Sequence, residues 1–234
     1  MNKFVTAGNQ IPLLMLTKKR ISLLIALIGG VEVSIYLWAV WTSTLDSSNY
    51  FAIQSEFVFD KSARLAGRIS SVLILFTLLM VSYYGLKKIY ADDQKRDSFL
   101  ILMTLFAFNH VIHLLFVILR FRSHGESITF AGPIDIGGPV HGFITFSFIV
   151  ILPFILWRYK YLNKLLYSVI ILHLLNISCF IIKTFLGKVK LPDHPAYHNQ
   201  FGVVVITAAC VYMLYSVYSE NKRISTIGDE HQTS

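Results

Sequence analysis

The sequence predicts an all-α integral membrane protein, a bundle of six transmembrane helices with both termini in the cytoplasm. Hydrophobic residues make up 55% of the chain and charged residues 15%, a balance that soluble domains do not have. A helix needs about 20 mainly apolar residues to cross a bilayer. Stretches of roughly that length, each bounded by charged or turn-forming residues, occupy positions 21–41, 65–86, 98–119, 140–157, 165–185 and 201–217.

The basic residues orient these spans. The first span follows Lys18-Lys19-Arg20, but it is longer than the apolar part of a signal peptide and no small-residue cleavage site follows, so we expect it to remain as an anchor. With the N-terminus inside, 13 of the 21 Lys and Arg residues fall on the cytoplasmic side and eight on the outer side. Cytoplasmic loops retain positive charge, which favours this orientation in the inner (plasma) membrane.

The connections are too short for a separate soluble domain. We therefore expect a cytoplasmic segment at 1–20, one multi-pass transmembrane domain at 21–217 and a polar cytoplasmic tail at 218–234. Aromatic and acidic residues at 50–60 indicate either a short helix in the outer interface or an irregular loop. Topology and membrane lipid account for the net charge of +8, and no basic and aromatic surface for a nucleic acid is present.

Ionisable residues enter the predicted spans at four positions: Glu32, His110, His113 and His173. At a rise of ~1.5 Å per residue they lie about 13, 13, 9 and 18 Å below the outer ends of their spans. His110 and His113 also share one helix face. Burying such groups in lipid costs several kcal/mol unless they have a partner or a task, so this common layer is the main functional signal.

Several kinds of site fit this layer. Neutral imidazoles from facing helices are good axial ligands for a haem. Two or three histidines together with Glu32 would also coordinate non-haem iron, copper or zinc. The same residues suit a proton relay. The structural alternative is that each side chain forms a hydrogen bond with a neighbouring helix and fixes the packing.

More histidines lie on the predicted outer surface. His141 begins the fourth span after His124 and Glu126, and His194 and His198 precede the sixth span. They would bind copper or zinc from outside, form part of a docking surface for an electron acceptor, or lie as solvated loop residues.

Spans two to five resemble the ferric reductase-like transmembrane domain family, which includes haem-binding membrane subunits. The resemblance begins at Arg-Leu-Ala-Gly in 64–67 and continues to the basic pair at 87–88. It is stronger at Leu-Phe-Ala-Phe-Asn-His-Val-Ile-His-Leu-Leu in 105–115, and it includes Tyr-Leu-Asn-Lys-Leu-Leu-Tyr in 161–167 with the histidine at 173. About half of the chain is covered.

The resemblance implies a membrane b-type haem protein that passes electrons to an extracytoplasmic acceptor, and hence an oxidoreductase subunit. It implies that His113 and His173 are the axial ligands, with His110 as the substitute for either, and Arg64 and Arg68 near the haem propionates. Members of the family that bind two haems have two widely separated histidines on each of these helices. This chain has Phe99 and Asn163 at the positions of the second pair, so one haem is expected.

No Gly-rich dinucleotide-binding segment is present, so a reductase of this kind would take its electrons from a quinol or a separate flavoprotein, with partner subunits. A proton-coupled transporter remains the alternative from another class. In that case Glu32, which follows Gly29-Gly30, would titrate together with the histidines during transport.

Overall fold

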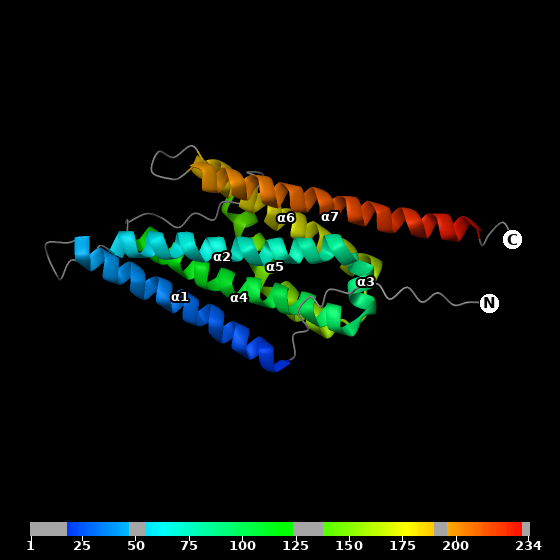
Figure 1. Cartoon of the computed structure of the whole chain (residues 1–234), viewed down its shortest axis with the longest axis horizontal. Coiled ribbons are helices and arrows are strands. Elements are labelled where there is room, and N and C mark those ends of the chain that lie inside the picture. The colour runs from blue at the N-terminus through cyan, green and yellow to red at the C-terminus, as the bar shows by residue number, and fades with distance from the viewer. Residues whose placement is uncertain (1–17, 47–54, 124–137, 190–195, 231–234) are drawn as a thin grey trace, which may run out of the picture.

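The computed structural model describes residues 18–46, 55–123, 138–189 and 196–230, and the regular elements within these ranges are all α-helices. The long helices run side by side along the long axis, with α1 and α7 at opposite edges (Figure 1). In chain order the helices are α1 (Lys18–Asp46), α2 (Ser55–Tyr84), α3 (Leu86–Ala91), α4 (Asp93–Ser123), α5 (Gly138–Arg158), α6 (Lys164–Val189) and α7 (Ala196–Glu230).

Within the described residues, α1, α2, α4, α6 and α7 are long and apolar enough to cross a membrane. The apolar part of α5 within the fully described residues, Ile144–Arg158, is shorter than these five spans. The predicted all-α class and the multi-pass membrane character are thus confirmed, with five candidate spans. The polar tail predicted at 218–234 begins as a continuation of α7, which reaches Glu230.

Helix α2 begins ten residues before the predicted span. Of the aromatic segment at 50–60, residues 55–60 form the first turns of α2, and residues 50–54 lie outside the described residues. Asp60 stabilises this extension because it pairs with Arg64 one turn along α2 and with Arg120 on α4, where Nε lies 3.2 Å from Oδ1. Phe59 stacks on Tyr36 of α1 with ring centroids 6.5 Å apart. Polar pairing therefore continues the helix beyond the apolar window that marked the span.

The short helix α3 was not predicted. Gly85 separates it from α2 and has φ +77°, a left-handed conformation that glycine adopts without strain. This turn folds the chain back, so that Leu86, Ile89 and Tyr90 are buried in the core. The polar loop expected between spans two and three thus contributes to packing.

The main core lies between α2, α4, α5, α6 and α7. Its largest fully buried side chains include Ile74, Leu78, Phe99, Phe106, Leu152, Leu156 and Ile170. Helix α2 packs on α1, α4, α6 and α7, while α5 contacts both α4 and α6. Helices α4 and α6 form no extended contact with each other. The two helices expected to supply the histidines are therefore held apart, with α5 beside both.

Candidate functional site

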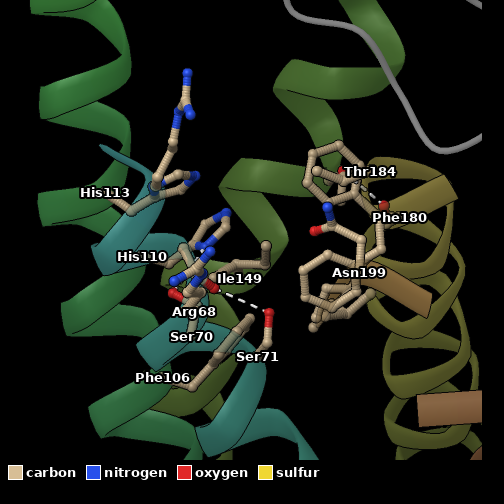
Figure 2. Close-up of a pocket in the computed structure, with 16 residues that line it drawn as sticks. Arg68, Ser70, Ser71, Phe106, His110, His113, Ile149, Phe180, Thr184 and Asn199 are labelled. Atoms are coloured by element: carbon tan, nitrogen blue, oxygen red, sulfur yellow. Dashed lines mark hydrogen bonds between the residues drawn. The ribbon is translucent and has the colours of Figure 1, made fainter. Parts of the chain in front are cut away.

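A cavity lies between α2, α4, α5, α6 and α7, in the half of the bundle predicted to face outward (Figure 2). It contains about 730 Å³ of space free of protein atoms, part of it open to the outside. His110 and His113 lie on one side of it, with Phe180, Thr184 and Asn199 on the other. The cavity brings together two of the three predicted histidine ligands.

One face of α4 supplies the histidine side of the cavity. Phe106, His110 and His113 are spaced four and three residues apart, so they lie in one row along the helix. The His110 ring stacks on Phe106 with centroids 5.4 Å apart and lies 5.4 Å from the His113 ring. The predicted shared face of His110 and His113 is therefore confirmed, and that face is directed into the bundle.

Asn109, next to His110, joins α4 to α2. Its side chain is fully buried, and Nδ2 donates hydrogen bonds to the Ala66 carbonyl at 2.9 Å and to Ser70 Oγ at 2.8 Å. The same Ser70 hydroxyl lies 3.4 Å from His110 Nδ1, a long contact. These contacts fix the rotation of α4 against α2, and with it the direction of the histidines.

Gly67 of α2 provides space for His113. A Cβ atom at this position would lie 3.1 Å from His113 Cε1, tighter than ordinary van der Waals contact. The imidazole therefore packs directly on the α2 backbone. A larger residue at 67 would displace the ring.

Arg64 and Arg68 both line the cavity, as expected of rim residues. Arg64 forms an ion pair with Asp60, a carboxylate that it shares with Arg120. Arg68, one turn deeper along α2, is exposed and has no carboxylate within ion-pair distance among the described residues. It is the better placed of the two to meet an anionic group.

His173 does not line the cavity, but it lies on the α6 face that does. Ile177, Phe180, Ile181 and Thr184 line the cavity from α6, and His173 is one turn before Ile177 on the same face. Its side chain is buried, and Nε2 has no hydrogen-bond partner in the structure. Because buried polar atoms are almost always paired, this nitrogen calls for an explanation.

Contacts with α5 set the relative levels of the histidines. The His110 ring lies 6.1 Å from Phe146, and the His173 ring lies 6.2 Å from Phe148, two residues further along α5. Two residues correspond to a rise of ~3 Å. His113 lies one further turn toward the outer end. By these contacts His110 is closer in level to His173 than His113 is, although Phe146 and Phe148 lie about half a turn apart and so contact the two histidines from opposite sides of α5.

Glu32 is also buried, with 2% of its surface exposed, and neither carboxylate oxygen has a hydrogen-bond partner. It lies on the same α1 face as the buried Ala39, toward α2 and α4. Tyr36, one turn further out, stacks on Phe116 of α4 at 6.2 Å, which brings Glu32 near the level of His113. Glu32 does not line the cavity, so the expected common layer is divided between two sides of the α2–α4 pair.

The predicted metal sites differ in how far the structure describes them. Among the described residues, no three His, Cys, Asp or Glu side chains gather at metal-binding distance, so the set of His110, His113, His173 and Glu32 does not form one shell. The side chain of His141 and all of His194 lie outside the described residues. His198 is exposed at the start of α7, where it lines a groove together with Arg68.

Sequence reasoning missed the neutral polar residues around the cavity. Asn199 of α7 is buried in its lining. Thr145 of α5 accepts a hydrogen bond from Asn176 of α6 at 3.1 Å. Asn109 was quoted only as part of a motif. The available signal was the presence of amide and hydroxyl side chains within otherwise apolar spans, since such groups hydrogen-bond across helices in membranes.

No model of a known protein family matches the chain, and comparison with curated proteins and with solved structures likewise found no match.

We predict that Asn109→Ala lowers the free energy of unfolding by about 1–2 kcal/mol, because it removes two buried hydrogen bonds between α4 and α2. Thermal unfolding of the purified protein in detergent measures this. Asn176→Ala, which removes one half-buried bond between α6 and α5, is the matched control and should cost less. Equal losses in the two variants would contradict the role of Asn109 as the main polar contact.

Proposed function

We propose that this protein is a membrane b-type haem protein that transfers electrons, with the haem between α4 and α6. The observation that carries the proposal is the unpartnered Nε2 of the buried His173, on the α6 face that lines the cavity opposite His110 and His113. A ring nitrogen left without a partner in an apolar interior suits a ligand that the protein chain does not provide.

The chemistry of the described residues fits this group. His110 and His113 line the cavity from α4, and His173 lies one turn before Ile177 on the α6 face that lines it, while α4 and α6 form no extended contact with each other. The similar levels of His110 and His173 favour this pair as axial ligands, with His113 as the alternative on α4. Phe106 and Phe180 offer apolar ring faces beside the same space. A haem held there would supply one-electron transfer.

Arg68 would bind a haem propionate in this arrangement. Its guanidinium is at the cavity and has no acidic partner among the described residues, whereas Arg64 is paired with Asp60. Arginine is well suited to carboxylates because its planar fork forms two parallel hydrogen bonds. Asn199 of α7 and Ser71 of α2 would add polar contacts at the same cavity.

The proposed topology has six spans: the five long apolar helices and, in addition, α5. Both termini lie on the cytoplasmic side of an inner (plasma) membrane. This orientation follows from the excess of basic residues at the end where α2, α5 and α7 finish. It puts the cavity in the outer half of the bilayer, close to an extracytoplasmic acceptor. A membrane quinol or a separate flavoprotein is the proposed electron donor.

Absorption spectra of protein purified from haem-replete cells test the proposal. We expect a Soret band in the native protein, loss of most bound haem in His173→Ala, and a larger loss in His110→Ala than in His113→Ala. His198→Ala is the control, because this histidine is exposed at the start of α7 and does not line the cavity, and it should retain haem. A colourless native protein would rule the proposal out.

Glu32 supports a second candidate, proton-coupled transport. Its carboxylate is buried, with neither oxygen in a hydrogen bond, and such a group within a membrane marks a proton or ion pathway more often than a packing contact. In this case Glu32 would bind and release a proton at the junction of α1, α2 and α4. The histidines would not share its site, because Glu32 does not line their cavity.

Proteoliposomes separate the two candidates. Transport predicts that a colourless native protein dissipates an imposed pH gradient when a transported solute is added, and that Glu32→Gln abolishes this flux. Glu32→Asp, which keeps the carboxylate, should retain part of it. Identical fluxes in native protein and Glu32→Gln across a panel of small solutes would count against this candidate.

A further inference from the structure

A second recess lies at the opposite end of the bundle, between the end of α2, the start of α3 and the last membrane turns of α7. Its empty space is about 960 Å³ and it is partly open. We call it the inner groove. Its lining includes Lys87 and Lys88 together with Tyr83, Tyr84, Tyr212, Tyr215, Ser216 and Ser219.

The lining is rich in hydrogen-bond donors and positive charge. Lys87 and Lys88 are exposed, and the ammonium of Lys87 lies 5.5 Å from the centre of the Tyr167 ring. No carboxylate lies within ion-pair distance of Lys88 among the described residues. Tyrosine and serine side chains line the groove together with the two lysines. This set of donors is complementary to an oxygen-rich anion.

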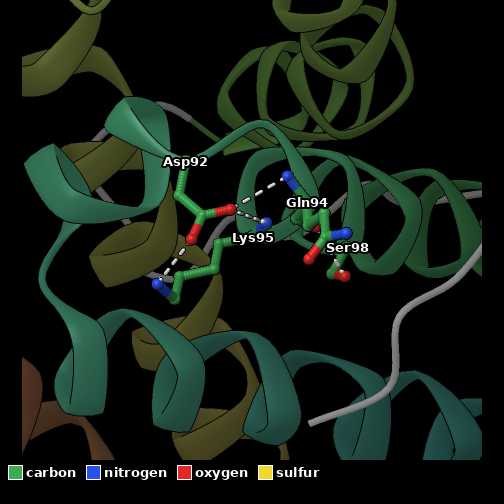
Figure 3. Close-up of polar contacts among 4 residues, drawn as sticks. All are labelled: Asp92, Gln94, Lys95 and Ser98. Atoms are coloured by element: carbon green, nitrogen blue, oxygen red, sulfur yellow. Dashed lines mark hydrogen bonds and ion pairs between the residues drawn. The ribbon is translucent and has the colours of Figure 1, made fainter. Parts of the chain in front are cut away.

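The neighbouring Lys95 does not add to this charge. Its Nζ donates a hydrogen bond to Asp92 Oδ2 at 2.6 Å, while Asp92 Oδ1 accepts from the backbone N–H groups of Gln94 and Lys95 at the start of α4 (Figure 3). The hydrogen bond from the Lys95 side chain lowers the pKa of Asp92, so Asp92 is ionised at neutral pH and balances Lys95. Lys87 and Lys88 are thus the cations that line the groove.

Among the described residues that line the inner groove, Glu220 is the one acidic residue. Its Oε1 accepts a hydrogen bond from the Lys87 backbone N–H at 3.2 Å, and its Oε2 accepts one from the Tyr167 hydroxyl at 3.2 Å. Both oxygens are therefore engaged with α3 and α6. The two lysines leave the lining with a net positive charge of one.

An apolar surface leads from the lipid-facing side of α2 into the inner groove. Side chains spaced four, three and four residues apart form one exposed row along this helix. The row consists of Val72, Phe76, Leu79 and Tyr83. Its last member, Tyr83, also lines the groove. An acyl chain lying along this row would end with its headgroup at the lysines.

We infer that the inner groove binds an anionic phospholipid, with its phosphate between Lys87 and Lys88 and an acyl chain along the exposed row of α2. Basic pockets between transmembrane helices on the cytoplasmic side suit such headgroups, and tyrosine is favoured at that level of the membrane. The site is separate from the histidine cavity and does not depend on the proposed haem.

Native mass spectrometry of the full-length protein, titrated with phosphatidylglycerol or phosphatidylcholine, tests this inference. Phosphatidylglycerol should bind about tenfold more tightly than phosphatidylcholine, and Lys87→Gln/Lys88→Gln should remove that preference. Lys88→Glu, a single change at an exposed residue, should also remove the preference. It replaces the double variant in the test if the double variant folds poorly. Inorganic phosphate should not displace the lipid, because it lacks the acyl chain.

The control is Lys160→Gln/Lys164→Gln, an equal loss of charge at exposed lysines at the predicted cytoplasmic end of α5 and α6, outside the groove. It should retain the preference for phosphatidylglycerol. An equal loss in both double variants would indicate diffuse attraction and overturn the site. Equal affinity of the native protein for the two lipids, or displacement by inorganic phosphate, would also overturn it.

Discussion

The buried contact between Asn109 of α4 and the Ala66–Ser70 turn of α2 is the constraint on which the candidate site depends. An asparagine in an apolar interior has to find hydrogen-bond partners, because an unpaired amide there is costly. Its Nδ2 donates to an α2 carbonyl and to a hydroxyl, while its buried Oδ1 has no partner in the structure, and the two bonds fix both the rotation and the level of α4 against α2. The adjacent His110, and His113 one turn further, are thereby directed into the bundle.

Other polar contacts complete this frame. Asp60 joins the outer ends of α2 and α4 through Arg64 and Arg120. Helix α5 is bound to α4 by the hydrogen bond from Trp157 Nε1 to Thr104 Oγ1 at 3.0 Å, and to α6 by the bond between Asn176 and Thr145. Helices α4 and α6 form no extended contact with each other, and the cavity lies between them.

The fold class could be predicted from the sequence because apolar length alone marks a membrane helix. The extent of the helices could not be predicted in the same way. The first turns of α2, from Ser55, are stabilised by the pair of Asp60 with Arg120, and such a pair depends on two helices being adjacent. The short helix α3 escaped prediction for a related reason. Its buried face is defined by the positive φ of Gly85 and by the core it meets, and a six-residue segment that includes Lys87 and Lys88 carries neither signal alone.

The sequence predicted how deep the ionisable residues lie in the membrane, but not toward which neighbouring helices their side chains are directed. Counting residues along each span gave comparable levels for Glu32 and the histidines, and the aromatic contacts of Tyr36, Phe146 and Phe148 agree with that estimate. Whether a residue faces the cavity depends on helix rotation, which buried groups such as Asn109 determine. For this reason Glu32 was assigned to the histidine layer although it lies on another side of the α2–α4 pair.

The central claim is that imidazoles from α4 and α6 bind one group between them. Electron paramagnetic resonance of the oxidised, purified protein tests it most directly, since the spin state of a ferric haem depends on both axial ligands. We expect a low-spin signal in the native protein that becomes high-spin or disappears in His173→Ala. A low-spin signal that persists unchanged in His173→Ala, or no haem signal in the native protein, would contradict it.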